Sequence, residues 1–264
     1  MKKNKKKFPL VSVIMNCFNG EKYLATSIKS VLNQSYKNWE LIFWDNVSTD
    51  RSSEIIKSFS DKRIKYFKSK KFERLYKARN LALKKTKGKY ICFLDVDDIY
   101  KKNFILEHLD KIKKDNCNIV YSKYLVKNEK TKKIYLNEKK KLSSGFITQN
   151  ILSKNNVGIS ATLLKKSLFK KFKFNNKYQI IGDFDFFFNL STKYRFCSLD
   201  RALLTYRFHD LSFTKKNTKI YLNELKSWLN SNKKKLDQKN INLTNFKMLI
   251  FKIRIKYFFN KLFN

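Results

Sequence analysis

Glycine, proline and histidine are scarce in this chain, which contains 5, 1 and 2 of them among its 264 residues. No Gly-, Ser- or Pro-rich linker divides the chain, and no internal repeat is visible. The glycines lie too far apart for a Gly-x-Gly-x-x-Gly fingerprint or a Walker phosphate loop, which excludes two common nucleotide-binding motifs. They are Gly20, Gly88, Gly145, Gly158 and Gly182.

Cysteine is also sparse, and no two cysteines form a Cys-x-x-Cys pair. This spacing argues against a structural zinc site and against the disulfide framework of a small secreted domain. We therefore expect reduced thiols, as in a cytoplasmic protein. The cysteines are Cys17, Cys92, Cys117 and Cys197.

Long apolar runs are absent as well. A membrane-spanning helix needs roughly 18 or more consecutive apolar residues, and the chain contains no such run. The basic start, Met1–Lys7, looks like the first part of a signal peptide, but Pro9 and Ser12 interrupt the apolar stretch that follows. No small-residue cleavage site comes after it, so we expect no signal peptide.

Acidic residues are few, with 21 Asp and Glu against 60 Lys and Arg, a net charge of +39 and a pI of about 10. Such a positive field favours anionic partners, which include nucleic acid, anionic lipid and phosphorylated substrates. The 42% hydrophobic content supports a sizeable core, in one large α/β domain or one domain with a C-terminal appendage.

Against this basic background, one cluster of carboxylates stands out. The apolar run Tyr90–Leu94 is long enough for a buried strand and is followed at once by Asp95, Asp97 and Asp98. Clustered carboxylates repel one another unless a cation or proton compensates them, and hard oxygen ligands suit Mg²⁺ or Mn²⁺. The alternative is a helix N-terminus, with Asp97 or Asp98 capping a helix that begins near Tyr100.

The first half of the chain alternates short apolar runs with amphipathic segments, which predicts a largely parallel sheet flanked by helices. Ligands in such sheets bind at the carboxyl ends of the strands, where Asn16, Asp45 and Asp95 are expected. The predicted strands are Leu10–Met15, Trp39–Trp44, Arg63–Phe67 and Tyr90–Leu94. Three helices are predicted. The first covers about 21–34 and the third about 76–85. The second contains Ile55, Ile56 and Phe59, and Ser48 or Thr49 would cap its N-terminus.

The second half is less regular. A strand pair is expected at Ile119–Val126 and Lys133–Leu136, with further strands at Val157–Leu164 and Leu203–Phe208 and a helix at Asp183–Thr192. From Lys215 onward, 13 Lys or Arg accompany two acids, Glu224 and Asp237, which places a domain boundary near residue 213.

Five pieces in order resemble the family 2 glycosyltransferases, which have the GT-A fold, over residues 9–212. Any one of these pieces is a weak signal, and their shared order is the strong one. They are Leu10–Asn19, the acid-containing stretch Asp45–Asp50, the Lys-Ala-Arg-Asn of 77–80, the Phe-Leu-Asp-Val-Asp-Asp of 93–98, and, as the closing pair, Ile181–Asp185 with Tyr206–His209.

The resemblance implies an inverting transferase that uses a nucleotide-sugar donor, usually a uridine diphosphate sugar, with Mn²⁺ or Mg²⁺. It also implies a GT-A domain in residues 1–213, with donor binding in about 8–126 and acceptor binding in about 127–213, and a basic helical extension in 214–264. The carried-over roles are nucleotide binding by Asn16, Asp45 (uracil), Arg79, Asp95 (ribose or metal) and His209 (near the diphosphate), metal binding by Asp97, and general-base catalysis by Asp183.

Several residues depart from the family pattern. Asn16-Cys17 replaces a common Pro-Thr, Asn46-Val47 replaces an acid and a glycine, and Arg74 stands where glycine is frequent. Gly182 takes the place of a glutamate that often precedes the base, so Asp185 remains an alternative base.

Each role has a structural alternative. Asp45 would then only form a turn before Ser48, Arg79 would lie on an exposed helix face, Asp183 would cap a helix, and His209 would satisfy a structural hydrogen bond. The alternative function, drawn from charge alone, is nucleic-acid binding without catalysis, although no recognised nucleic-acid-binding motif is present.

The acceptor implied by the family is a cell-surface polysaccharide or a lipid-linked glycan. The segment Phe246–Phe263 mixes bulky apolar residues with five cations, which is typical of interfacial helices on anionic membranes. We therefore expect a peripheral protein on the inner face of the cytoplasmic membrane. The alternative is a helix that packs on the catalytic domain.

Overall fold

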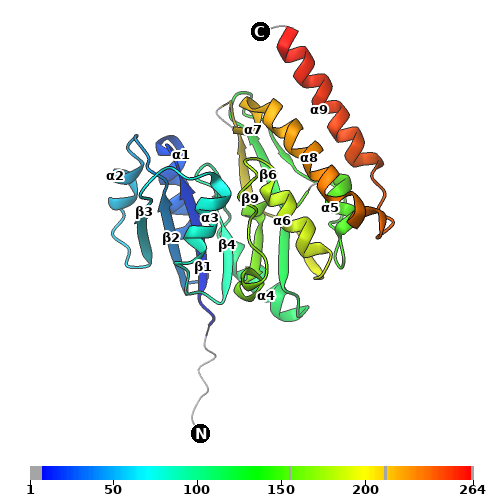
Figure 1. Ribbon diagram of the computed structural model, residues 1–264. Coiled ribbons are helices and arrows are strands. Elements are labelled where there is room, and N and C mark those ends of the chain that lie inside the picture. Colours follow the sequence, from blue (N-terminus) through cyan, green and yellow to red (C-terminus); the bar gives the residue numbers. More distant parts are fainter. Residues whose placement is uncertain (1–7, 155, 211–212, 263–264) are drawn as a thin grey trace.

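The structure, a computed structural model, describes residues 8–154, 156–210 and 213–262 (Figure 1). The basic start 1–7, Phe263 and the side chain of Lys261 lie outside the described residues. The described chain forms one mixed sheet with helices on both faces, and two helices at the C-terminal end pack on one of these faces (Figure 1). This arrangement confirms the predicted α/β class with a helical C-terminal region.

The first half of the fold follows the predicted alternation closely. Apolar runs form the strands because both of their faces are covered by helices. The elements are β1 (Val11–Cys17), α1 (Glu21–Leu32), β2 (Trp39–Asp45), α2 (Ser52–Lys57), β3 (Ile64–Lys68), α3 (Leu75–Leu83), β4 (Tyr90–Phe93), β5 (Ile99–Tyr100) and α4 (Phe104–Lys114).

The second half supplies the remaining strands and the helices of the other face. Its elements are β6 (Ile119–Asn128), β7 (Ile134–Leu136), α5 (Thr148–Lys154), two 3₁₀ turns (Ile159–Ala161 and Lys166–Lys170), β8 (Thr162–Lys165), α6 (Gly182–Ser191), β9 (Phe196–Phe208), α7 (Phe213–Lys216), α8 (Thr218–Asp237) and α9 (Thr244–Leu262).

The sheet has the order β3-β2-β1-β4-β8-β6-β9-β5, with β7 paired to β6. Strands β3, β2, β1 and β4 are mutually parallel, whereas β8 runs antiparallel to both β4 and β6. The carboxyl ends of β1, β2 and β4 therefore lie along the same edge, where Asn16, Asp45 and Asp95 are found. The predicted parallel sheet is correct for this half. The other half of the sheet begins at β8, which is antiparallel to both of its neighbours.

Two local predictions are wrong. Residues Ile159–Ala161 turn as a 3₁₀ segment, because the Thr162 hydroxyl donates to the Ile159 carbonyl oxygen, and only Thr162–Lys165 is a strand. The helix expected after Ser48 or Thr49 begins at Ser52, and neither hydroxyl caps it. The Ser48 hydroxyl instead accepts a hydrogen bond from the Asn19 N–H.

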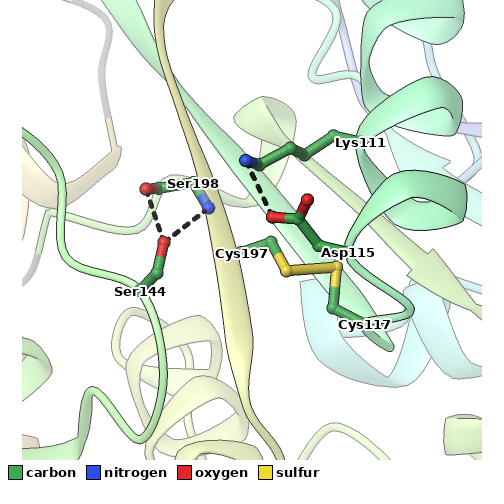
Figure 2. Close-up of a disulfide and its surroundings, with 6 residues drawn as sticks. All are labelled: Lys111, Asp115, Cys117, Ser144, Cys197 and Ser198. Atoms are coloured by element: carbon green, nitrogen blue, oxygen red, sulfur yellow. Dashed lines mark hydrogen bonds and ion pairs between the residues drawn. A yellow bond between two sulfur atoms is a disulfide. The ribbon is translucent and has the colours of Figure 1, made fainter.

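The expectation of four reduced cysteines is also wrong. Cys117 and Cys197 are joined by a disulfide, with their Cα atoms 6.3 Å apart (Figure 2). The pair forms because β6 and β9 are parallel neighbours, and Val120, three residues after Cys117, lies opposite Cys197. Sequence separation hid this proximity, so cysteine spacing gives no support to a reducing compartment.

Residues of helices α8 and α9 belong to one hydrophobic core with the sheet and α6. Trp228 is fully buried, and its ring centroid lies 4.8 Å from that of Phe184, 4.7 Å from Phe188 and 5.3 Å from Phe246. Its indole N–H donates to Asp185, with the two atoms 2.9 Å apart. For the segment 246–263, the alternative of a helix that packs on the domain is therefore correct at Phe246 and Ile253, which are both buried.

A Trp228→Ala variant tests whether this docking is part of one cooperative structure. Loss of a buried tryptophan typically costs about 3–5 kcal/mol of unfolding free energy, so we expect a large loss in a single urea transition. Leu229→Ala, at a half-buried neighbour, is the matched control and should cost less. A separate early transition of the C-terminal helices, with the main transition unchanged, would contradict shared packing.

Candidate active site

A buried arginine connects two carboxylates from distant parts of the chain. The guanidinium of Arg79, on α3, donates from Nη2 to Oδ1 of Asp95 at 2.7 Å and from Nη1 to Oδ1 of Asp183. Asp95 follows β4, and Asp183 lies in the first turn of α6. The side chain of Arg79 is 1% exposed, whereas those of Asp95 and Asp183 are 41% and 26% exposed. Both carboxylates therefore retain a solvent-facing side.

The surroundings explain why a cation is stable at this depth. The guanidinium carbon lies 5.6–5.8 Å from the ring centroids of Tyr76, Phe93 and Phe174. Aromatic faces attract cations, and two ionised partners compensate the cost of burying the charge. Burial alone would lower the pKa of Arg79, but Asp183 and Asp95 raise it above its usual value. The structural alternative for Arg79, a position on an exposed helix face, is therefore wrong.

Burial shifts the pKa of Asp183 in the opposite direction. It raises the pKa of the Asp183 carboxyl, while Arg79 lowers it and Asp95 raises it further. A carboxylate whose pKa is raised is a stronger proton acceptor when it is ionised. Asp183 therefore combines basicity with partial exposure, the two properties that a general base requires.

The loop before Asp183 is fixed from α8. The carboxylate of Glu224 accepts hydrogen bonds from the N–H groups of Gln179, Ile180 and Ile181, at 2.6, 3.0 and 3.1 Å. A carboxylate that accepts several N–H groups holds a loop firmly, because charge-assisted hydrogen bonds are strong. The sequence patterns predict no role for Glu224, although it stands out as one of only two acids in the strongly basic segment from Lys215 onward.

The same loop is held on its other side by α3. The Tyr76 hydroxyl donates to the Ile180 carbonyl oxygen at 2.7 Å. A Cβ atom on Gly182 would lie 2.5 Å from the Tyr76 ring, so only glycine fits there. The departure from the family's common glutamate at this position therefore has a local cause.

Asp97 pairs with one of the two histidines. Its Oδ2 lies 2.9 Å from Nε2 of His209, whose ring packs 5.1 Å from that of Tyr23. Nδ1 of His209 is buried and has no hydrogen-bond partner among the described residues. Asp97 is 28% exposed, so the pair stands at the surface of the site.

Asp98 turns inward. It accepts a hydrogen bond from the Arg207 N–H at 3.3 Å, and burial, followed by repulsion from Asp97 and Asp95, raises its pKa well above the usual range. The helix-cap alternative for Asp97 and Asp98 is wrong, because β5 follows at Ile99–Tyr100 and the next helix begins at Phe104.

Two further residues of the predicted site, Asn16 and Asp45, lie at the carboxyl ends of β1 and β2 in different environments. Asp45 is fully buried, accepting from the Ser48 N–H at 2.8 Å and the Tyr66 hydroxyl at 2.7 Å. It therefore forms the turn that sequence analysis left open. Both polar atoms of the Asn16 side chain are buried and have no hydrogen-bond partner among the described residues. The same is true of the indole nitrogen of Trp44, which lies opposite Asn16 on β2.

The alternative base, Asp185, points away from this cluster. It is 8% exposed and accepts hydrogen bonds from Trp228 at 2.9 Å and from the Asn189 side chain at 3.3 Å. The structure thus brings Arg79, Asp95 and Asp183 into contact, pairs Asp97 with His209, and uses Asp185 to dock α8.

The side chains that the structure describes do not by themselves form a complete metal centre. No group of three or more His, Cys, Asp or Glu among the described residues is arranged to hold a metal ion. A cation such as Mg²⁺ commonly binds one or two carboxylates together with substrate phosphates, so an incomplete protein shell is compatible with it.

Comparisons with known proteins decide the family. Residues 12–172 match glycosyl transferase family 2. The chain belongs to glycosyl transferase family 2. The uncharacterized glycosyltransferase MJ1057 of Methanocaldococcus jannaschii is 33% identical over 211 residues, covering 75% of this chain and 71% of that protein.

A second relative is the Escherichia coli UDP-Glc:alpha-D-GlcNAc-diphosphoundecaprenol beta-1,3-glucosyltransferase WfgD. It is 35% identical over 167 residues, covering 62% of this chain and 64% of that protein. The match therefore spans less than two thirds of the length of this relative.

Solved structures confirm the GT-A fold. Residues 1–349 of S. aureus TarS in complex with UDP-GlcNAc match with a TM-score of 0.63 at 18% identity, covering 83% of this chain and 66% of that one. The mannosyltransferase PcManGT from Pyrobaculum calidifontis, in complex with GDP-Man and Mn²⁺, matches with a TM-score of 0.62 at 14% identity, covering 83% and 63%. Among the described residues, none of the helices is both long and apolar enough to cross a bilayer.

An Arg79→Lys variant tests the shared ion pair. Lysine keeps the positive charge but lacks the planar fork that reaches two carboxylates at once, so we expect a large loss of sugar transfer and a loss of roughly 1–3 kcal/mol in unfolding free energy. Enzymatic assay and urea denaturation measure both. Lys77→Arg on the same helix is the control and should be neutral. A stable, fully active Arg79→Lys protein would contradict the bridge.

Proposed function

We propose that this family member transfers a sugar from a UDP-sugar to a hydroxyl of a lipid-linked glycan or polysaccharide, with inversion at the anomeric carbon. The observation that carries the proposal is the pair of ion pairs that Arg79 forms with Asp95 and Asp183. They hold Asp95, at the strand edge, near the Asp183 carboxylate, whose pKa is raised. The E. coli relative acts on a diphosphoundecaprenol-linked acceptor, and the TarS structure contains a UDP-sugar. Family membership favours the enzyme over the nucleic-acid-binding alternative.

Asp183 would act as the general base. As the acceptor oxygen attacks the anomeric carbon, its proton passes to the Asp183 carboxylate, and the bond from that carbon to the diphosphate breaks, with the electron pair leaving on the diphosphate. Arg79 holds the carboxylate in place through Oδ1. Among the described residues, the Asp183 carboxylate accepts hydrogen bonds through Oδ1 only, which leaves Oδ2 to accept the proton.

The donor would lie at the carboxyl ends of β1, β2 and β4. Asn16 is the strongest candidate for nucleotide contact, because a buried amide without partners is costly unless a ligand completes its hydrogen bonds. Asp95 would face the ribose or the metal. Since both Asp45 oxygens already accept hydrogen bonds, we propose that Asp45 shapes the loop to Ser48 and leaves contact with the base to neighbouring residues.

The residues present fit a divalent cation. Asp97 offers a partly exposed carboxylate, and His209 beside it has a buried ring nitrogen without a partner. We propose that Asp97 holds Mn²⁺ or Mg²⁺, with His209 near the diphosphate. When bound, such an ion neutralises the charge that develops on the leaving diphosphate.

An Asp97→Ala variant tests the metal proposal. Loss of the carboxylate should weaken UDP binding in the presence of Mn²⁺, measured by calorimetry, because the cation is then poorly held. Transfer should also become insensitive to EDTA at a low residual rate. Wild-type affinity for UDP in the variant, together with full wild-type activity in EDTA, would refute the assignment.

An Asp183→Asn variant tests the base. A general base contributes about 10²–10⁴-fold, so kcat should fall by that factor while UDP binding is retained. Because burial raises the Asp183 pKa, the wild-type rate should fall with decreasing pH through a value above that of a free aspartate, and this limb should vanish in the variant. Asp185→Asn is the control. If Asp185→Asn loses the large factor and Asp183→Asn does not, the base is misassigned.

We further propose that the outer face of α9 binds anionic lipid, which would hold the enzyme on the inner face of the cytoplasmic membrane. Phe246 and Ile253 pack into the core, but Met248, Phe251 and Phe258 are 46–60% exposed. Lys252, Arg254 and Lys256 lie between them and are exposed as well. Aromatic residues at a lipid head-group boundary, with cations that meet anionic lipid, are typical of interfacial helices. The helix diverges from the body of the molecule towards its C-terminal end (Figure 1).

Replacement of Phe251 and Phe258 by serine tests this proposal without disturbing the core. Burial of one phenylalanine contributes about 1.5–3 kcal/mol, so binding to phosphatidylglycerol vesicles should fall at least tenfold in a sedimentation assay. The double change Ile134→Ser and Tyr135→Ser, at two similarly exposed positions on β7, is the matched control. Equal vesicle binding by both double variants would contradict a lipid-binding role for α9.

A further inference from the structure

A cavity of about 310 Å³ lies next to Asp183. Three parts of the chain form its walls: the end of α5 with the segment that follows, the start of α6, and the C-terminal helices. Its volume is at the lower end of the range for small-molecule sites. The residues that line the cavity include Ser153, Asp183, Thr214, Tyr221, Leu225 and Leu249.

The wall formed by α8 and α9 is fixed in place. The rings of Phe184 and Phe246 are stacked, with centroids 5.4 Å apart and an interplanar angle of 12°. The turn between the two helices is tied to α5 by a pair of hydrogen bonds between Gln149 and the backbone of Asn242, at 2.9 and 3.0 Å. The cavity is therefore part of the folded structure rather than a gap between loosely attached elements.

The lining of the cavity includes both polar and apolar groups. Asp183, Ser153 and Thr214 provide groups that hydrogen-bond to hydroxyls, and Tyr221 adds an aromatic face. Leu225 and Leu249 supply apolar surface on the side of the C-terminal helices.

We propose that this cavity is the acceptor site, and that α8 and α9 select the acceptor. It takes an amphiphilic acceptor, a sugar linked through diphosphate to a lipid. The sugar hydroxyl lies at Asp183, and the first apolar carbons lie against Leu225 and Leu249. This inference rests on the function proposed above, because it assigns to Asp183 the hydroxyl that the base deprotonates. It gives the C-terminal helices a role in specificity that is separate from lipid-surface binding by the outer face of α9.

Leu249→Trp tests the site, because a larger ring at this half-buried wall position reduces the cavity. The matched control is Ile250→Trp, on the same helix and also half-buried but outside the cavity lining. The probes are synthetic N-acetylglucosaminyl diphosphates with a methyl or a decyl tail, with UDP-glucose or UDP-N-acetylglucosamine as donor. For the decyl acceptor, KM should rise about tenfold or more in Leu249→Trp and remain near wild type in Ile250→Trp.

The wild type should also favour the decyl acceptor over the methyl one, and Leu249→Trp should lose that preference. Donor hydrolysis without acceptor should be the same in all three proteins. If hydrolysis is normal but acceptor KM does not depend on tail length or on Leu249, the cavity assignment is wrong while the proposed transferase function stands. If the wild type neither hydrolyses nor transfers from these donors, the proposed function itself is wrong for them. Should Leu249→Trp fail to fold, Ser153→Phe, at a lining position on α5, narrows the cavity and should raise acceptor KM in the same way.

Discussion

The ion pairs of one buried arginine hold this site together. Arg79 is nearly inaccessible to water, and its charge is stable there only because Asp95 and Asp183 both reach it. Asp95 belongs to the strand edge where the donor would bind, and Asp183 belongs to the helix that borders the proposed acceptor cavity. A single guanidinium thus fixes the distance between the two halves of the proposed reaction. It also limits how far burial raises the pKa of Asp183.

The C-terminal helices complete this arrangement from the other side. In a chain with few acids, Glu224 and Asp185 are both used to join α8 to α6 and to the loop before it. The same helices contribute Leu225 and Leu249 to the cavity beside Asp183. The basic extension is therefore structurally continuous with the catalytic part, and α9 reaches the proposed lipid surface with its outer residues only.

Much of this structure was predictable from sequence, because the relevant signals were local. The run Tyr90–Leu94 followed by acids marks a strand end, and alternating elements put Asn16 and Asp95 on one edge of the sheet. The Cys117–Cys197 disulfide and the role of Glu224 were not predictable, because they depend on contacts between residues 80 and about 44 positions apart. The direction of the Asp45 side chain was equally hidden, since Tyr66 reaches it only after β2 and β3 pair.

The most direct test of the shared guanidinium is a double-mutant cycle. The unfolding free energies of Asp95→Asn, Asp183→Asn and the double variant are measured in urea against the wild type. Either single change leaves Arg79 one ionised partner, whereas the double change leaves a buried cation with none. The account predicts that the double variant loses more than the sum of the single losses, by roughly 0.5–3 kcal/mol. Additive losses would show that the two carboxylates act independently and would contradict the account.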